Sequence, residues 1–91
     1  FNSIQVREGQ VIGLLDGILA TAGATYGEVV VDLLHRMEAE QAEIITIYYG
    51  EGVSEEEAQA LQDLVRQEFP QQEVELVAGG QPYYPFILSV E

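Results

Sequence analysis

The sequence predicts an α+β domain, a two-layer sandwich in which two helices pack on one face of a mixed β-sheet. Two segments, residues 26–38 and 54–69, have apolar residues at helical spacing, whereas the other apolar segments are short and alternating or β-branched. The predicted order is β-β-β-α-β-α-β-β, in which the interleaved helices need a sheet to pack against. A chain of 91 residues has room for one domain with one core.

The N-terminal part is predicted to form short strands and a hairpin. Residues 4–6 alternate apolar and polar side chains, which predicts a first strand. Residues 11–15 and 18–20 are the arms of a hairpin, because the Asp-Gly dipeptide between them suits a type I′ turn with positive φ at both positions. Gly13 in the middle of a strand predicts a bulge or the close approach of another segment.

The first helix is predicted over Tyr26–Glu38. Thr25 and Glu28 have the spacing of a capping box at its start. The apolar face that follows at positions i, i+3, i+4 and i+7 consists of Val30, Leu33, Leu34 and Met37. His35 lies near the helix end, where the dipole favours a positive charge, and this or plain exposure explains it better than catalysis.

The central part predicts a parallel βαβ unit. Residues 44–49 are a continuous apolar run, as in central strands that are buried on both faces or nearly so. The second helix starts at a capping box, Ser54 to Glu57, and ends at Pro70. The strand at 73–78 then runs parallel to the first, and its alternating glutamates indicate one solvated face near a sheet edge.

Residues 77–90 are predicted to run as strand, reversal and strand, that is, as a second hairpin. The Gly79-Gly80 pair allows positive φ and close backbone approach, and two following prolines stiffen the loop. Tyr83 and Tyr84 therefore lie on a defined scaffold. Two interpretations stay open at this point: the tyrosines cap the core, or they form a recognition surface.

The charge is unusually negative, with a formal net charge of −13 and only three basic residues, all arginine. Binding to nucleic acid is excluded, since it needs Lys and Arg to neutralise phosphates, and anionic membranes repel such a surface. A basic protein partner or a simply solvated surface remains as the meaning of the charge.

Cysteine is absent from the sequence, which excludes disulfides and thiolate metal sites and suits a cytoplasmic protein. No apolar run approaches the ~18 residues of a membrane-spanning helix.

No set of residues predicts catalysis or metal binding. The sequence has no His-x-x-x-His spacing, and Gly79-Gly80 lacks the Lys-Ser/Thr and the helix of a phosphate loop. The carboxylates at 55–57 are explained by the positive end of the helix dipole. We therefore predict no catalytic residue and no metal ligand in this chain.

Five segments taken together resemble a known family. They are GQVIGLLDG at 9–17, AEIITIYYGE at 42–51, SEEEA at 54–58, GGQPYYP at 79–85 and SVE at 89–91. In this order they resemble the C-terminal domain of FakA, the kinase component of bacterial fatty acid kinase, over nearly the whole chain. The layout is also similar to the C-terminal half of DegV-type fatty-acid-binding proteins. The second and fourth segments are the specific ones, because the hairpin and helices alone would not distinguish the family.

The resemblance implies that residues 1–91 are a single, non-catalytic domain at the C-terminus of a longer, multidomain kinase-like protein. In that family, a dihydroxyacetone-kinase-like N-terminal domain binds ATP and magnesium, so no cofactor is expected in this chain. The kinase phosphorylates a fatty acid that is held by a DegV-like carrier protein, and the C-terminal domain is implied to dock that carrier. The N-terminal kinase domain of the same protein is a second expected partner, and a homodimer of the full-length protein remains open.

The candidate docking residues lie at the end of the central strand and in the loop before the last strand. They are Tyr48, Tyr49, Gly50, Gly79, Gly80, Gln81, Pro82, Tyr83 and Tyr84. Because sites in βαβ units collect at the carboxyl ends of the strands, we expect residues 48–50 and 77–80 at one edge. The alternative functions are an acyl-chain-binding domain and a dimerisation module that uses an exposed sheet edge.

Overall fold

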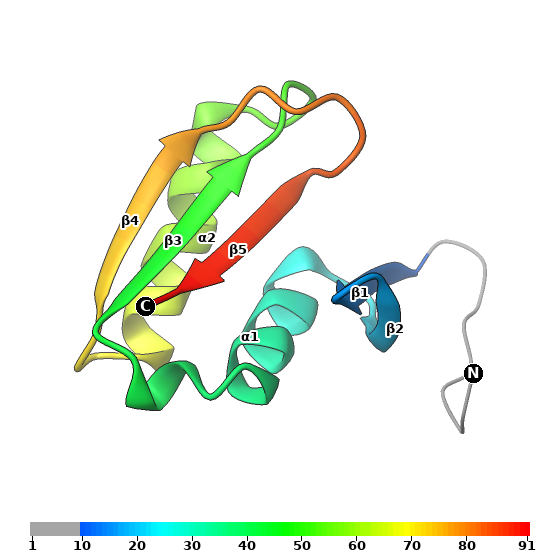
Figure 1. The fold of residues 1–91 in the computed structure, drawn as a ribbon. Coiled ribbons are helices and arrows are strands. Elements are labelled where there is room, and N and C mark those ends of the chain that lie inside the picture. The colour runs from blue at the N-terminus through cyan, green and yellow to red at the C-terminus, as the bar shows by residue number, and fades with distance from the viewer. Residues whose placement is uncertain (1–9) are drawn as a thin grey trace. The chain divides into compact units, whose positions relative to one another are not determined.

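The computed structural model describes residues 10–91, which divide along the chain into two compact units with the boundary between Met37 and Glu38 (Figure 1). The first unit contains β1 (Val11–Leu15), β2 (Ile18–Gly23) and α1 (Tyr26–Arg36). The second contains the short 3-10 helix η1 (Ala39–Gln41), β3 (Ile44–Tyr49), α2 (Glu55–Glu68), β4 (Glu73–Ala78) and β5 (Phe86–Val90). The predicted α+β class and the order of the elements are confirmed; the strand predicted at 4–6 lies outside the described residues.

In the first unit, β1 and β2 form the predicted hairpin. Asp16 and Gly17 have φ values of 53° and 79°, so both turn positions are left-handed, as a type I′ turn requires. The register shifts between Gly13 and Leu14. A Cβ atom on Gly13 would lie 2.8 Å from Cδ1 of Leu33 in α1. The glycine thus marks both a bulge and a close helix contact.

The helix α1 begins as predicted but ends earlier. The Thr25 side chain accepts a hydrogen bond from the Glu28 amide at 3.2 Å, as predicted, but the Glu28 carboxylate accepts from the amide of Ala24 at 2.9 Å, one residue before the cap, so only half of the predicted capping box forms. The last helical residue is Arg36, because Glu38 adopts a left-handed φ of 58°. The buried apolar residues of this helix are Val29, Val30, Leu33 and Leu34.

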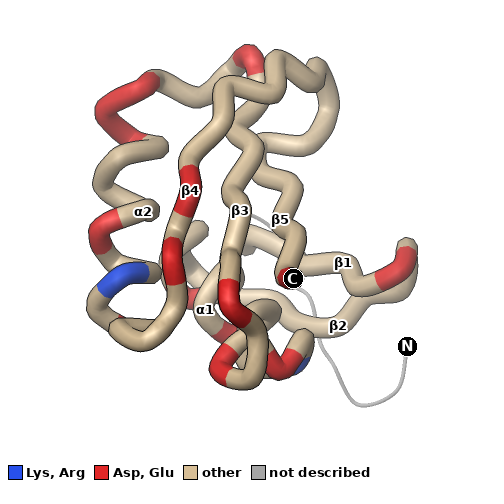
Figure 2. The backbone as a smooth tube through the Cα atoms, turned by 60° about the vertical axis from the view of Figure 1, so that its left-hand side comes forward, with Lys and Arg blue, Asp and Glu red and all other residues tan. Residues whose placement is uncertain are grey.

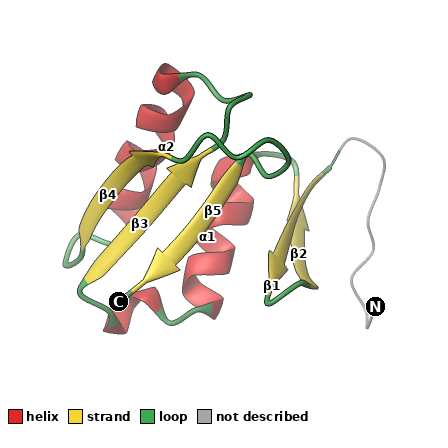
Figure 3. Ribbon diagram, turned by 45° about the horizontal axis from the view of Figure 1, so that its top comes forward, coloured by secondary structure: helices red, strands yellow, loops and turns green. Residues whose placement is uncertain are grey.

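In the second unit, β3 is the central strand of a three-stranded sheet, parallel to β4 and antiparallel to β5 (Figure 3). This confirms the parallel βαβ unit and the edge position of β4. The helix α2 starts at the predicted Ser54–Glu57 capping box and lies behind the sheet in Figure 1. The core consists of Ala39, Ile45, Ile47, Ala58, Leu61, Val65, Phe69 and Val74. Burial of β3 is one-sided, since its residues on the opposite face are only half-buried.

Residues 77–90 are not a hairpin, which corrects the sequence-based expectation. The strands β4 and β5 each pair with β3 and lie on its two sides. The strand β3 carries the two side chains of the described strands that are fully buried, Ile45 and Ile47, and such burial suits the central position of a sheet. The connecting residues therefore pass over the end of β3 instead of making a tight turn.

The expected single mixed sheet is likewise replaced by two sheets among the described strands, one in each unit. The strands β4 and β5 pair with the two sides of β3, and β1 and β2 pair with each other. Within its own unit, α1 packs on the hairpin, and α2 packs against the strands of the three-stranded sheet.

Candidate docking site at the carboxyl end of the central strand

The carboxyl ends of β3 and β4 coincide, as the βαβ topology predicts. Tyr48 lies opposite Val77, and Tyr49 lies opposite Ala78. The amides of Gly79 and Gly80 donate to the Tyr49 carbonyl oxygen at 2.9 and 3.2 Å, so the chain turns over β3 immediately after β4 ends.

Residues 79–85, which we call the tyrosine loop, are fastened to the end of β3 by three further hydrogen bonds. The side-chain Nε2 of Gln81 donates to the Tyr48 carbonyl at 3.0 Å. The amide of Glu51 donates to the Gln81 carbonyl at 3.0 Å, and the amide of Gly50 donates to the Pro85 carbonyl at 2.7 Å. Together with two prolines, these bonds give the loop a fixed backbone.

Gly50 makes this close seating possible. A Cβ atom at this position would lie 2.6 Å from the Tyr84 carbonyl oxygen and 2.8 Å from that of Gln81. Any side chain would therefore push the loop away from β3. Gly50 is buried, so its contribution to a docking surface is to shape the loop and not to touch a partner.

The two loop tyrosines point to solvent and are not part of the core. Tyr83 is 88% exposed and Tyr84 is 55% exposed, which contradicts the core-capping interpretation. Pro82, Gly79 and Gly80 are also exposed, while Tyr48, Tyr49 and Gln81 are half-buried. The structure thus brings all the predicted candidates together at one end of the sheet, with Tyr83 and Tyr84 as its most accessible large side chains.

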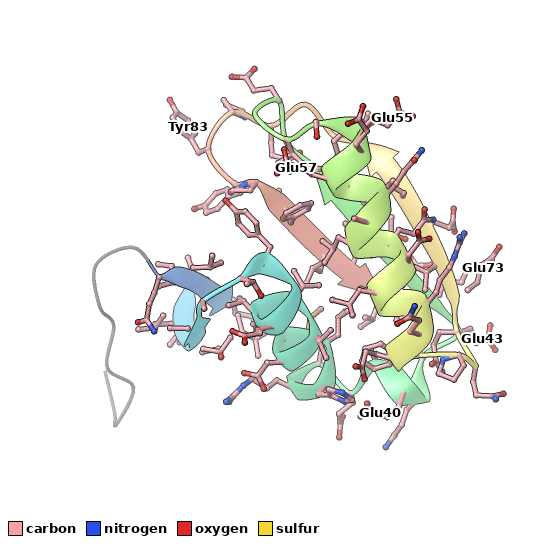
Figure 4. The ribbon with its side chains drawn as sticks, turned by 180° about the vertical axis from the view of Figure 1, so that it is seen from behind. Glu40, Glu43, Glu55, Glu57, Glu73 and Tyr83 are labelled. Carbon is pink, nitrogen blue, oxygen red and sulfur yellow. The ribbon has the colours of Figure 1, made fainter. Side chains whose placement is uncertain are left out.

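Carboxylates surround this end of the second unit. Figure 4 shows Tyr83 at the same end as Glu55 and Glu57 at the start of α2, with Glu40, Glu43 and Glu73 at the other end. Glu57 is used as a cap, since its carboxylate accepts from the Ser54 backbone amide at 3.4 Å. The coloured tube in Figure 2 shows acidic segments on α2 and β4. The loop itself carries no charge.

One electrostatic feature in the first unit escaped the sequence analysis. The pKa of Asp32 is lowered below its usual 3.8, and the largest cause is a hydrogen bond from the buried Thr21 hydroxyl. The Arg36 guanidinium, whose Nε lies 3.1 Å from Oδ2 of Asp32, lowers the pKa further. Burial of the carboxylate raises the pKa but does not cancel the lowering. The i,i+4 spacing of Asp32 and Arg36 could have revealed the ion pair. The contact with Thr21 on β2 needed the tertiary structure.

Nothing in residues 10–91 groups three or more His, Cys, Asp or Glu side chains as a metal ion requires. The helices of these residues are also too short or too polar to cross a membrane. What the geometry offers is a rigid loop with exposed aromatic side chains, which is an arrangement for binding.

The whole chain, residues 1–91, matches the family model of the fatty acid kinase FakA-like C-terminal domain. The chain belongs to this family. The resemblance found in the sequence segments is thereby confirmed, and the match includes the tyrosine loop and the strand end that it covers.

Relatives of this FakA-like C-terminal domain occur in bacteria. Protein YloV of Bacillus subtilis is 35% identical over 86 residues, which cover 94% of this chain and 16% of YloV. An uncharacterized protein of Staphylococcus haemolyticus is 33% identical over 90 residues, and one of Staphylococcus aureus is 27% identical over 90 residues; each alignment covers 99% of this chain. In each case, the aligned part is 16% of the relative's length, so this chain corresponds to a small part of those proteins.

Proposed function

We propose that this chain is a non-catalytic docking domain of a fatty acid kinase. It holds a fatty-acid-bearing, DegV-like carrier protein so that a separate N-terminal domain, with ATP and magnesium, phosphorylates the acyl carboxylate. Family membership supports the kinase context. The observation that carries the docking role is the exposed tyrosine pair on a loop that is fastened to the end of β3. We also propose a cytoplasmic location, since the proposed reaction uses ATP.

A fastened loop suits docking because binding then orders little new structure. Immobilising flexible side chains and loops at an interface costs about 0.5–1.5 kcal/mol per side chain, and a loop that is already fixed avoids much of this. Tyrosine provides a large contact area with few rotatable bonds, which is why it is common among the residues that dominate binding energy. The domain's contribution to phosphoryl transfer is then the positioning of the carrier.

The test uses the full-length protein with Tyr83→Ala and Tyr84→Ala, singly and together. We expect the double variant to bind the carrier at least about tenfold more weakly by titration calorimetry. Urea unfolding should be unchanged, because both side chains are exposed. Ile18→Ala is the matched control, since Ile18 is 61% exposed on the hairpin of the first unit. Unchanged affinity together with lost stability would refute the docking role of the tyrosines.

A dimerisation module is the second candidate, and β5 favours it. Within residues 10–91 this strand pairs on one side only, with β3, and Phe86–Val90 contains no charged residue to discourage pairing with another strand. Sedimentation velocity of the full-length protein decides the matter. A monomer over the whole concentration range would eliminate this candidate.

A further inference from the structure

A row of apolar side chains crosses the three-stranded sheet next to the tyrosine loop. Val77, Tyr48 and Ile87 are register partners on β4, β3 and β5. Since side chains alternate along a strand, this row points to the opposite face from Ile47, which is fully buried on the side of α2. Val77 is 39% exposed and Ile87 is 43% exposed, although both lie in regular strands. An accessible apolar strip therefore spans the width of the sheet.

The strip is continuous with the tyrosine loop. The loop residue Gln81 donates to the carbonyl of Tyr48, the middle residue of the row. A Cβ atom on Gly79 would lie 3.2 Å from Cβ of Tyr48, so the start of the loop rests against the same side chain. The tyrosine loop therefore begins directly beside the middle residue of the row.

The charged residues that border this surface within the described second unit, residues 38–91, are carboxylates. The next row on the same face contains Thr46 with Glu75 and Ser89 as its register partners. On the side of the loop, Glu51 is joined to Gln81 through its backbone, and both Glu51 and Glu75 are exposed. Arg66, the one basic residue of 38–91, lies on α2, where it pairs with Asp63 at 3.9 Å.

We propose that the docking surface extends from the tyrosine loop over the Val77–Tyr48–Ile87 row. Its occupant is a protein whose matching surface is apolar at the centre and carries arginine or lysine where it meets Glu75 and Glu51. This inference rests on the proposed function, since it adds surface and chemistry to the same carrier contact. A free fatty acid does not fit, because its carboxylate would be repelled by the bordering glutamates.

The test compares two variants of the full-length protein with matched controls. Val77→Thr combined with Ile87→Thr keeps β-branched side chains but places hydroxyls in the row, and we expect about tenfold weaker carrier binding. Glu75→Gln should slow association several-fold and reduce its dependence on salt, as expected for a charge that steers a basic partner. The controls are Ile18→Thr at the start of β2 and Glu68→Gln at the end of α2, both exposed and away from the row in the chain.

The outcomes separate this inference from the proposed function. If both variants bind normally while the Tyr83/Tyr84 double variant binds weakly, the extension over the row is refuted and the docking role stands. If no variant changes binding, both are refuted. Should the double threonine variant unfold, the salt dependence of Glu75→Gln still decides the charge requirement, because this side chain is exposed.

Discussion

The turn at 16–17 and the tyrosine loop at 79–85 both reverse the chain, but only the loop crosses a strand. The turn joins β1 to β2, which are neighbours, whereas the loop joins β4 to β5 across β3. Each reversal has a glycine with positive φ, +79° at Gly17 and +71° at Gly80. A Cβ atom added to either glycine would have no atom within 4 Å apart from those of the glycine and its two chain neighbours. The two reversals thus share a left-handed glycine in open space, although only the turn at 16–17 has a second left-handed residue, Asp16.

The difference lies in what holds each reversal. The turn at 16–17 is determined by its two residues and by the flanking strands. The loop must span two strand spacings, roughly 9.6 Å, and it uses hydrogen bonds to the end of β3 along that path. A reversal that crosses a strand thus acquires tertiary contacts, and these turn a connection into a rigid surface.

The largest expected effect is that of Gly50→Ala, which would break the seating of the loop on β3. The added methyl group meets backbone oxygens that cannot rotate away, so we expect a loss of about 1–3 kcal/mol in the free energy of unfolding, together with weaker carrier binding. Gly52→Ala is the control, since Gly52 has open space around it and a φ outside the left-handed region. Equal stability of the two variants in urea would mean that the loop is not seated on β3.

The next largest effect is expected from the same glycine-to-alanine substitution made in each of the two reversals. Gly17→Ala and Gly80→Ala each place a Cβ at positive φ without a clash, so each should lower the free energy of unfolding by about 1 kcal/mol. Only Gly80→Ala should also weaken carrier binding, measured by calorimetry on the full-length protein. Weakened binding in Gly17→Ala would show that the hairpin turn belongs to the docking surface as well.

Gln81→Ala removes one of the bonds that distinguish the loop from the turn. The lost hydrogen bond to the Tyr48 carbonyl should lower the free energy of unfolding by about 0.5–1 kcal/mol and loosen the loop. Thermal unfolding measures the first effect, and faster amide exchange at Glu51 measures the second. Gln71→Ala, at an exposed position between α2 and β4, should change neither quantity.

The smallest effect concerns Asp32, which links α1 to β2 of the hairpin through Thr21. Its pKa is lowered in the folded state, so its stabilising contribution is present above its usual pKa of 3.8 and is lost as the pH falls through the folded value. Asp32→Asn should therefore cost less than about 1 kcal/mol at pH 7, because the side chain is 43% exposed, and the cost should shrink as the pH falls toward 2.

Urea unfolding of both proteins between pH 2 and pH 7 measures this difference. Asp63→Asn is the control, because its carboxylate is 71% exposed and only loosely paired. A difference between Asp32→Asn and the native protein that is the same at every pH would contradict a role for the charge.

Most elements of the fold follow from neighbouring residues. The capping box at Ser54 and the stop at Pro70 set the ends of α2, and the Asp-Gly dipeptide set the hairpin turn. Glu38 shows the limit of this reasoning. Its left-handed backbone ends α1 at Arg36, two residues before the predicted end, and the sequence has no glycine there that would have predicted this conformation. The candidate site was predicted as a set of residues, whereas the positions of Glu75 beside Thr46 and of Ile87 beside Tyr48 arise only from the pairing with β3.

Side-chain patterns within a few residues were enough to predict the type, order and approximate limits of the described strands and α-helices, and a resemblance spread over five segments predicted the family. Three features needed the folded chain: β3 separates β4 from β5, each unit has its own sheet, and Tyr83 and Tyr84 face solvent. The reason is that a strand's neighbours are chosen by competition among distant segments for the same hydrogen-bonding edges and the same buried face. No local pattern records the result of that competition.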